Sequence, residues 1–312
     1  MSLTPEQIEQ RRGGIGSSDV AAVCGLNPWR APIDVWLEKT GKAEPRPDSV
    51  ASVIGTEMEG VIARLYAERF GALLMEAGTV AHAEESWRLA TPDRFVRGDG
   101  DGAIRIVEIK MVGHRLAHHW QDEAVPEYVT AQVLWQQDVT GIHAAHVAAV
   151  VGGTEFVVQA IEWDPDTVRM LVDVGREFWE RHVLRDIPPP IDASESWKRY
   201  LASKWPRAGA KMLKADDNID RLIKTRFAAK AAADKLAEKI ELADNHLRAL
   251  IGAERGISGA GWQASWTERK GSVDWQALAK ELGATDEQAE RHRRAGTRTM
   301  RVTQSSRRLL TS

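Results

Sequence analysis

The stretch that decides the fold runs from Thr91-Pro92-Asp93 through a turn-rich segment to Ile104-Arg105-Ile106-Val107-Glu108-Ile109-Lys110. Alternate side chains of a β-strand share a face, so Glu108 and Lys110 project together, while Val107 and Ile109 can pack into a core. Two carboxylates and an ammonium group suit metal-dependent phosphodiester hydrolysis. In that chemistry the carboxylates hold a hard cation such as Mg²⁺, the cation activates water, and the lysine orients or deprotonates it. Taken alone, the same string also fits a solvated strand face that carries one ion pair.

The composition is that of a protein large enough to bury a full core. The chain has 312 residues, 43% of them hydrophobic, and a single cysteine, Cys24. One cysteine can form neither an intrachain disulfide framework nor an iron–sulfur cluster, and it favours a reducing compartment. The first residues are polar and charged, and no long uninterrupted apolar stretch follows. We therefore expect no membrane association and a cytoplasmic location.

The formal charge of −3 hides an asymmetry between the two parts of the chain. Residues 193–312 contain 24 Lys and Arg against 15 Asp and Glu, whereas residues 1–192 contain 18 against 30. An acidic part that carries a metal site and a basic part that contacts a polyanion would suit a nucleic-acid enzyme. A solvated basic helical surface is the simpler alternative.

The periodicity predicts alternating helices and strands in the first part of the chain. Residues 5–41 read as short helices, residues 49–70 as an amphipathic helix ended by Gly71, and residues 126–140 and 164–185 as further helices. Strands are expected near residues 72–82, 87–91, 94–97, 104–111, 146–151 and 155–162, with a hairpin loop at 98–102.

Pro188-Pro189-Pro190 is the expected domain boundary, since neither a helix nor a central strand runs through it. This divides the chain into a core at residues 1–190 and a helical, basic region at residues 191–312. The second region should contain a long helix at 216–251, a short helix at 273–282, and strands at 262–268 and 298–303.

A series of further motifs surrounds the acid–lysine string. Upstream lie Arg11-Arg12-Gly13-Gly14-Ile15-Gly16-Ser17-Ser18-Asp19, then residues 32–41, then Gly55-Thr56-Glu57-Met58-Glu59; downstream lies Pro126-Glu127-Tyr128-Val129-Thr130-Ala131-Gln132. In this order the motifs resemble the YqaJ-type viral recombinase family, the phage alkaline exonucleases that include lambda exonuclease. The resemblance covers roughly residues 8–190. It implies the PD-(D/E)XK nuclease fold, an α/β (α+β) core in which helices flank a mixed central sheet.

The resemblance also implies roles for individual residues. Asp93, Glu108 and the backbone carbonyl of Ile109 would bind the metal, Glu59 would add a further acid, and Lys110 would position the attacking water. Arg11 and Ser18 would grip the terminal 5′ phosphate of DNA. Thr91 and Gln132 are further expected DNA-site residues, with Gln132 beside the catalytic lysine.

Three alternatives stay open at this point. Asp99 or Asp101 competes with Asp93 as the ligand, because the spacing from Asp93 to Glu108 is long. Arg12 is adjacent to Arg11, so only the spacing to Ser18 selects between them. His114 and His118 are four residues apart and, with His119, could form a zinc site on a helix.

The resemblance leads us to expect a Mg²⁺-dependent 5′→3′ exonuclease of phage or prophage recombination, with Mn²⁺ as a possible substitute cation. Its substrate would be double-stranded DNA, its product a 3′ overhang, and its partner a single-strand annealing protein. A ring-shaped homo-oligomer such as a trimer is also implied. A structure-specific endonuclease on the same fold and a non-catalytic DNA-binding or annealing-partner protein are the competing functions.

Overall fold

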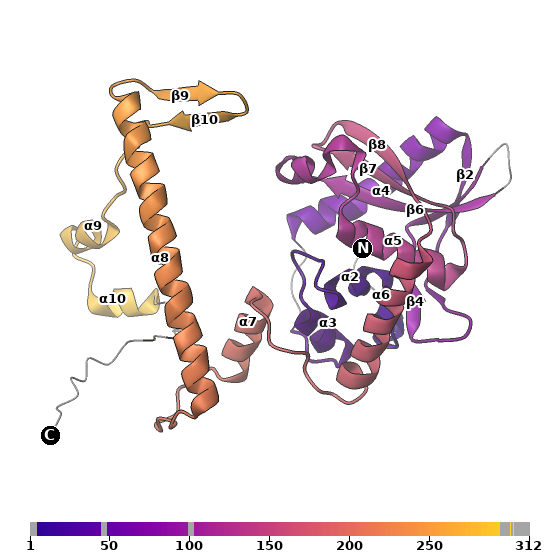
Figure 1. Cartoon of the computed structure of the whole chain (residues 1–312), viewed down its shortest axis with the longest axis horizontal. Helices are drawn as coiled ribbons and strands as arrows, with labels where there is room; N and C mark the ends of the chain where they lie inside the picture. Colours follow the sequence, from indigo (N-terminus) through magenta and orange to yellow (C-terminus); the bar gives the residue numbers. More distant parts are fainter. Residues whose placement is uncertain (1–4, 45–48, 99–102, 294–299, 301, 303–312) are drawn as a thin grey trace. The chain divides into compact units, whose positions relative to one another are not determined.

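The structure, a computed structural model, describes residues 5–44, 49–98, 103–293, 300 and 302. The chain divides into two compact units, Met1–Lys204 and Trp205–Ser312 (Figure 1). The division falls after Lys204, later than the expected boundary at Pro190, because α7 (Glu195–Lys204) belongs to the first unit. Trp197 of α7 is buried there and donates from Nε1 to the carbonyl of Pro190 at 3.1 Å.

A mixed five-stranded sheet forms the centre of the first unit, as expected for the α/β class. Its strand order is β2-β5-β6-β7-β8. The pair β6–β7 is parallel and the other neighbouring pairs are antiparallel. The strands are β2 (Ala72–Glu76), β5 (Arg94–Gly98), β6 (Ile104–Val112), β7 (Ala145–Val151) and β8 (Glu155–Ile161).

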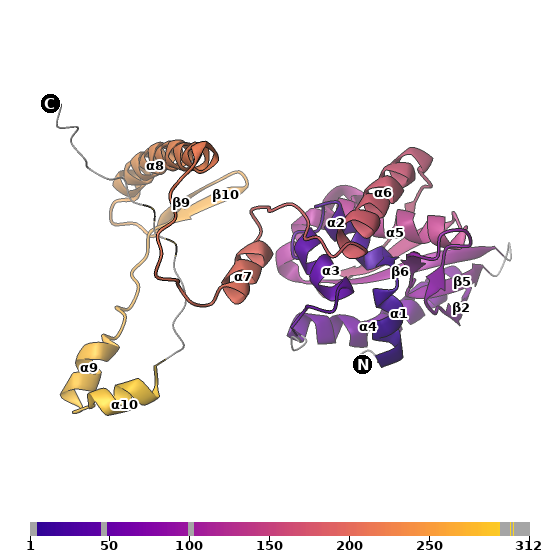
Figure 2. The ribbon, with the colours of Figure 1, turned by 90° about the horizontal axis from the view of Figure 1, so that it is seen from below.

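Helices cover both faces of this sheet (Figure 2). On one face, α4 (Val50–Phe70) packs Ile62 and Tyr66 against Val107 and Ile109 of β6. On the other lie α5 (Glu127–Thr140) and α6 (Pro165–Glu177), above Ile106 and strand residues of the same parity. The expected helix to residue 185 continues past Glu177 as a π-helical turn, Phe178–Val183. Because β6 alternates, Glu108 and Lys110 face α5.

A small second sheet joins the N-terminal helices to the core. Its order is β1-β4-β3, formed by β1 (Ile15–Gly16), β4 (Arg88–Ala90) and β3 (Val80–Ala81). Around it lie α1 (Pro5–Arg12), α2 (Ser17–Val23) and α3 (Pro32–Lys39). Gly14 is required at this junction, since a Cβ there would lie 2.1 Å from the carbonyl oxygen of Trp87. The close approach fixes the turn between α1 and α2.

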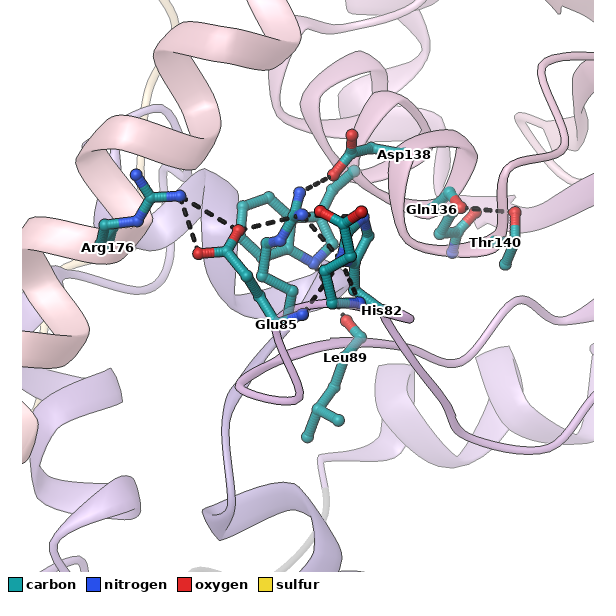
Figure 3. A network of polar contacts seen from close by, with 10 residues as sticks. His82, Glu85, Leu89, Gln136, Asp138, Thr140 and Arg176 are labelled. Carbon is teal, nitrogen blue, oxygen red and sulfur yellow. Dashed lines mark hydrogen bonds and ion pairs between the residues drawn. The ribbon is translucent and has the colours of Figure 1, made fainter.

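A charged network fastens the segment before β4 to α5 and α6 (Figure 3). Arg88, almost fully buried, forms an ion pair with Asp138 of α5 and donates to His82. Glu85 bridges Arg88, at 3.0 Å, and Arg176 of α6, at 2.8 Å. The neighbouring carbonyl of Leu89 accepts from Trp135 Nε1 at 3.0 Å. Together these contacts fix the helix that faces Glu108.

The second unit is built on α8 (Asp217–Ile251), a helix of 35 residues that matches the expected one closely. A hairpin of β9 (Gly256–Gly259) and β10 (Trp262–Ser265) lies beside its C-terminal end (Figure 1; Figure 2). Two short helices follow, α9 (Trp275–Glu281) and α10 (Asp286–Arg291), of which the second was not expected. The strand predicted at 298–303 and the hairpin loop at 98–102 fall largely outside the described residues.

None of the helices in the described part of the chain combines the length and apolar character that crossing a bilayer requires.

Candidate active site

Glu108 is the centre of the site and is held from several directions. Its side chain is buried, and its Oε1 contacts Lys110 Nζ and accepts from Gln132 Nε2 at 2.6 Å. Its Oε2 accepts from Gln136 Nε2 at 2.7 Å. The expectation that Glu108 and Lys110 share a strand face is therefore confirmed. Three nitrogen atoms from two elements, β6 and α5, fix the carboxylate in one orientation.

Asp93 lies at the turn immediately before β5, next to Glu108. Its Oδ2 accepts from the backbone amide of Ile109 at 2.6 Å. The backbone pairing between β5 and β6 ends at Arg94 and Val107. Beyond that pair, the side chain of Asp93 accepts the hydrogen bond from β6 that a backbone carbonyl would otherwise accept. In an extended strand the N–H and C=O of one residue point to the same side. The carbonyl of Ile109 is thus directed toward the Asp93 side of β6, where it was expected as a ligand.

Burial and the neighbouring Glu108 make ionisation of Asp93 costly. Burial raises the pKa of Asp93 well above its usual range, and the charge of Glu108 raises it further. Burial alone would lower the pKa of Lys110, but the charges of Glu108 and Asp93 outweigh it and the pKa of Lys110 is raised. Lys110 is therefore a charged hydrogen-bond donor at neutral pH. A cation between the acids would relieve their repulsion.

A cavity of about 240 Å³ contains these groups. Its lining includes Asp93, Glu108 and Lys110 together with residues from the N-terminal helices. The remaining expected site residues are also in its wall: Arg11, Ser18, Glu59, Thr91, Ile109 and Gln132. Thus one cavity brings together every described residue that the motif series selected.

Asp19 and Lys39 form the opposite wall of the cavity from α2 and α3, and both side chains are buried. Asp19 Oδ2 accepts from Lys39 Nζ at 2.6 Å and from the amide of Gly16 at 2.9 Å, and Oδ1 pairs with Arg30 at 2.6 Å. Burial works to raise the pKa of Asp19, but the charges of Lys39 and Arg30 outweigh it and leave the pKa lowered. Asp19 thus remains charged, and it accepts the hydrogen bond of the Gly16 backbone amide at the start of α2.

The two neighbouring arginines of α1 have different surroundings. Arg11 lines the cavity, and its carbonyl accepts from Lys39 Nζ at 2.6 Å. Arg12 instead pairs with Glu9 at 3.7 Å on the outside of the helix. Ser18 is exposed in the same cavity as Arg11. The geometry therefore selects Arg11 over Arg12 as the arginine that can reach a bound group.

Glu59 reaches the cavity from α4, on the other side of the sheet from α5. Burial raises its pKa and Glu108 adds to the rise, against the attraction of Arg94 and Lys110. Within the described residues no group of three or more His, Cys, Asp or Glu side chains is arranged to hold a metal ion. A cation at Asp93 and Glu108 would thus complete its coordination with the Ile109 carbonyl and water, ligands that Mg²⁺ accepts.

The structure does not support the zinc alternative. His114, His118 and His119 are exposed on a 3₁₀ helix, His114–Glu123, which has three residues per turn, so positions four apart do not align. Among the described residues, these histidines do not belong to any group of three or more potential metal ligands. Asp99 and Asp101, the rivals of Asp93, lie outside the described residues.

Sequence reasoning missed Gln136 and the Asp19–Lys39 pair. Gln136 is fully buried and touches Glu108 directly. Its spacing of four from Gln132 places both on one helix face, a signal that could have identified it. No comparable spacing marks Lys39, whose burial depends on the packing of α3.

The fold and site together define a mixed α/β protein with an acid–lysine centre on a central strand. Residues 7–143 match the family described as the YqaJ-like viral recombinase domain. This match confirms the resemblance over those residues.

One bacterial protein is similar in sequence to most of this chain. The chain is 29% identical over 269 residues to the uncharacterized protein YqaJ of Bacillus subtilis (strain 168), covering 84% of this chain and 82% of that protein. Because 269 residues exceed the first unit, the similarity continues into the second.

Among solved structures, an alkaline exonuclease from Laribacter hongkongensis is similar with 19% identity and a TM-score of 0.49, over 65% of this chain and 100% of that one. A phage-related exonuclease from Haemophilus somnus 129PT has 11% identity and a TM-score of 0.41, over 55% and 96%.

Proposed function

We propose that this chain is a Mg²⁺-dependent 5′→3′ exonuclease that acts on double-stranded DNA and leaves 3′ single-stranded overhangs during phage or prophage recombination. The observation that supports it best is the cavity that combines Asp93, Glu108 and Lys110 with Arg11 and Ser18. The first three suit phosphodiester hydrolysis, and the last two suit an end-anchoring phosphate. The YqaJ-like viral recombinase domain over residues 7–143 supports the recombination setting.

In this proposal Asp93, Glu108 and the Ile109 carbonyl hold the cation, with Glu59 nearby, and Mn²⁺ substitutes for Mg²⁺. Bound there, the cation supplies Lewis-acid polarisation of the phosphate and activation of water. Gln132 and Gln136 keep Glu108 oriented for this role. Lys110, held in its charged form by the two acids, donates a hydrogen bond that orients the attacking water.

Arg11 and Ser18 give the proposal its dependence on DNA ends. A guanidinium and a hydroxyl can donate charge-assisted hydrogen bonds to a terminal phosphate. Thr91 and Gln132 line the same cavity as that anchor and Glu108. An enzyme anchored in this way would shorten linear duplexes from 5′-phosphorylated ends and spare closed circles. A single-strand annealing protein would then take the 3′ overhang, and a ring such as a trimer would retain the duplex.

The experiment compares linear duplex with a 5′ phosphate, linear duplex with a 5′ hydroxyl, and closed circular duplex, each with Mg²⁺. We expect fast digestion of the first, slower digestion of the second and none of the third. Arg11→Ala should remove the difference between the two linear substrates, whereas the control Arg12→Ala should keep it. Cleavage of closed circles would support the endonuclease alternative, and an absence of cleavage with Mg²⁺ or Mn²⁺ would support the non-catalytic one.

The same assay tests the chemistry. Asp93→Asn, Glu108→Gln and Lys110→Met should each reduce hydrolysis by about a hundred- to a thousand-fold, because each removes an electrostatic contact with the reacting phosphate or water. Circular dichroism should remain that of the wild type. Wild-type rates in any two of these variants would contradict the assignment of the active site.

A further inference from the structure

An apolar stripe runs along the whole of α8 in the second unit. Its positions are separated alternately by three and four residues, the spacing of a coiled-coil seam. Arg226 is its only charged member. The stripe consists of Ile219, Leu222, Arg226, Ala229, Ala233, Leu236, Ile240, Ala243, Leu247 and Leu250.

Four of the six large aliphatic side chains of this stripe are mostly exposed, while Leu247 is half-buried. The exposed fractions are 70% for Leu222, 60% for Leu236, 63% for Ile240 and 73% for Leu250. The other helices described in this unit, α9 and α10, have seven and six residues and are too short to cover a helix of 35. An apolar seam of this length in contact with water favours a helical partner of similar length.

We propose that α8 pairs antiparallel with α8 of a second copy of this chain. In an antiparallel seam the two sets of stripe positions oppose each other, so Ile219 faces Leu250 of the second copy and Leu222 faces Leu247. The inner layers then combine a large and a small side chain. Ala229 faces Ile240, Ala233 faces Leu236, and Arg226 faces Ala243. The two outer layers at each end thus oppose two large side chains, and no layer opposes two alanines, so the seam is filled without a cavity.

A parallel pair of the same helices would pack poorly. It would place Ala229, Ala233 and Ala243 each opposite its own copy and leave voids in the seam. It would also bring the two Arg226 side chains together, whose like charges repel. In the antiparallel arrangement Arg226 instead lies beside Asp244 of the second copy, which follows Ala243. Side-chain size and charge therefore favour the same orientation.

The charge of α8 also argues against a polyanion as its partner. The helix carries seven Lys and Arg against six Asp and Glu. Many of these are paired within the helix, as Lys230 is with Asp234 at 2.6 Å. A nearly neutral helix with an apolar seam suits another copy of itself better than it suits DNA. This inference is independent of the proposed nuclease activity.

Sedimentation of the full-length chain tests the pairing with two matched substitutions. Leu236 and Leu242 are 60% and 61% exposed on the same helix, but only Leu236 belongs to the stripe. Leu236→Glu should weaken association at least tenfold and halve the mass at micromolar concentration, whereas Leu242→Glu should leave the mass unchanged. A monomeric wild type, or equal effects of both substitutions, would overturn the proposal. A wild-type monomer in which only Leu236→Glu lowers thermal stability would show that the stripe packs within one chain.

Spin labels test the orientation. With Cys24 replaced by alanine, a label at Arg221→Cys or at Lys235→Cys lies on the outer face of α8. Antiparallel pairing places the two labels at 221 about 40 Å apart along the axis, since a helix rises 1.5 Å per residue, and those at 235 at nearly the same height. We expect a long distance for 221 and a short one for 235. Short distances at both sites would indicate a parallel pair and overturn the antiparallel arrangement.

Discussion

Gln136 is the residue through which α5 controls the orientation of Glu108. It is fully buried, and its Nε2 donates to Glu108 at 2.7 Å and to Ser17 Oγ at 3.4 Å. Its Oε1 is buried without a hydrogen-bond partner among the described residues. A buried oxygen without a hydrogen-bond partner lowers the free energy of unfolding, so Gln136 contributes less to stability than a fully paired amide would. Its role is to restrain the orientation of the Glu108 carboxylate.

We therefore expect Gln136→Met to separate activity from stability. The change keeps the shape of the side chain and removes the unpaired oxygen, so the free energy of unfolding should change by less than about 1 kcal/mol. Loss of the bond to Glu108 should weaken the apparent affinity for Mg²⁺ by about 10- to 100-fold, as for other groups that orient a ligand. Titration of cleavage rate with Mg²⁺ and chemical denaturation measure the two quantities.

Gln137→Met is the matched control for this prediction. Gln137 is equally buried and also has an unpaired Oε1, but it donates to the carbonyls of His143 and Ile161, away from the site. The Mg²⁺ dependence of this variant should be that of the wild type. If both variants shift it alike, Gln136 acts only through packing.

Asp93 allows a second prediction at this scale, from the sign of its pKa shift. Its pKa is raised in the fold, above the value of about 3.9 in an unfolded chain. The folded state therefore binds more protons, and its stability falls as pH rises from the unfolded toward the folded pKa. With a chelator at pH 7, Asp93→Asn should raise Tm by about 2–4 °C, the effect of 1 kcal/mol in a domain of this size.

Two further measurements complete this test. The difference in Tm should shrink as pH falls toward and below about 4, because Asp93 of the wild type then becomes protonated in the unfolded state as well as in the folded one. Addition of Mg²⁺ should stabilise the wild type and leave the variant unchanged. A variant that is less stable than the wild type in chelator would show that its bond to Ile109 outweighs the repulsion.

Much of this site follows from local rules, but not all of it. The period of two in β6 predicts that Glu108 and Lys110 share a face, and the contact between them agrees. The position of Asp93 follows from a turn before a strand. By contrast, the burial of Lys39 and its bond to Asp19 depend on how α2 and α3 meet, which no short-range pattern encodes. The catalytic roles stay predictions in either case.

At the scale of elements, the Arg88 network determines where α5 lies. Arg88 comes from β4, Asp138 from α5 and Arg176 from α6, with Glu85 between the two arginines (Figure 3). Three elements that are distant in sequence are joined by these charges, of which Arg88 is almost fully buried and Arg176 half-exposed. Gln132 and Gln136 are on the same helix as Asp138, so this joint also sets their approach to Glu108.

Breaking one side of the joint should be costly. Arg88→Met leaves Asp138 without its buried partner, and we expect a loss of about 3–5 kcal/mol in the free energy of unfolding. The double variant Arg88→Met with Asp138→Leu should lose less, because no buried charge is left alone. Urea denaturation measures both. Additive losses in the double variant would contradict a direct coupling between these two side chains.

The elements themselves were largely predictable, with errors at their ends. The helices at residues 49–70 and 126–140 and the strand at 104–111 appear with one boundary of each shifted by a single residue. The helix expected to reach residue 185 changes to a π-helical turn at Phe178, where Phe178 and His182 are buried together. Such a change depends on tertiary packing rather than on periodicity. The short α10, which has no buried residue, lacks the apolar pattern that would have predicted it.

At the scale of the whole molecule, the excess of basic residues in residues 193–312 does not come from the long helix α8. Residues 193–312 carry a net charge of +9, but α8 contributes only one unit of it. Residues 294–312 contain five arginines and no acid. If the second part contacts DNA through its charge, this terminal segment is a stronger candidate than the long helix.

This leads to a prediction for chains shortened at two places. A chain that ends at Arg293 loses the five arginines, and the slope of log affinity for duplex DNA against log salt should become shallower by up to about 4.5, at 0.9 per phosphate contact. A chain that ends at Lys204, the boundary of the first unit, should have nearly the same shallow slope, because the further residues removed add little net positive charge. Filter binding at several salt concentrations measures the slope.

Both chains should retain Mg²⁺-dependent cleavage, since Asp93, Glu108 and Lys110 lie within the first unit. A full slope in the chain that ends at Arg293 would place the contacts elsewhere, and loss of slope only in the shorter chain would assign them to residues 205–293.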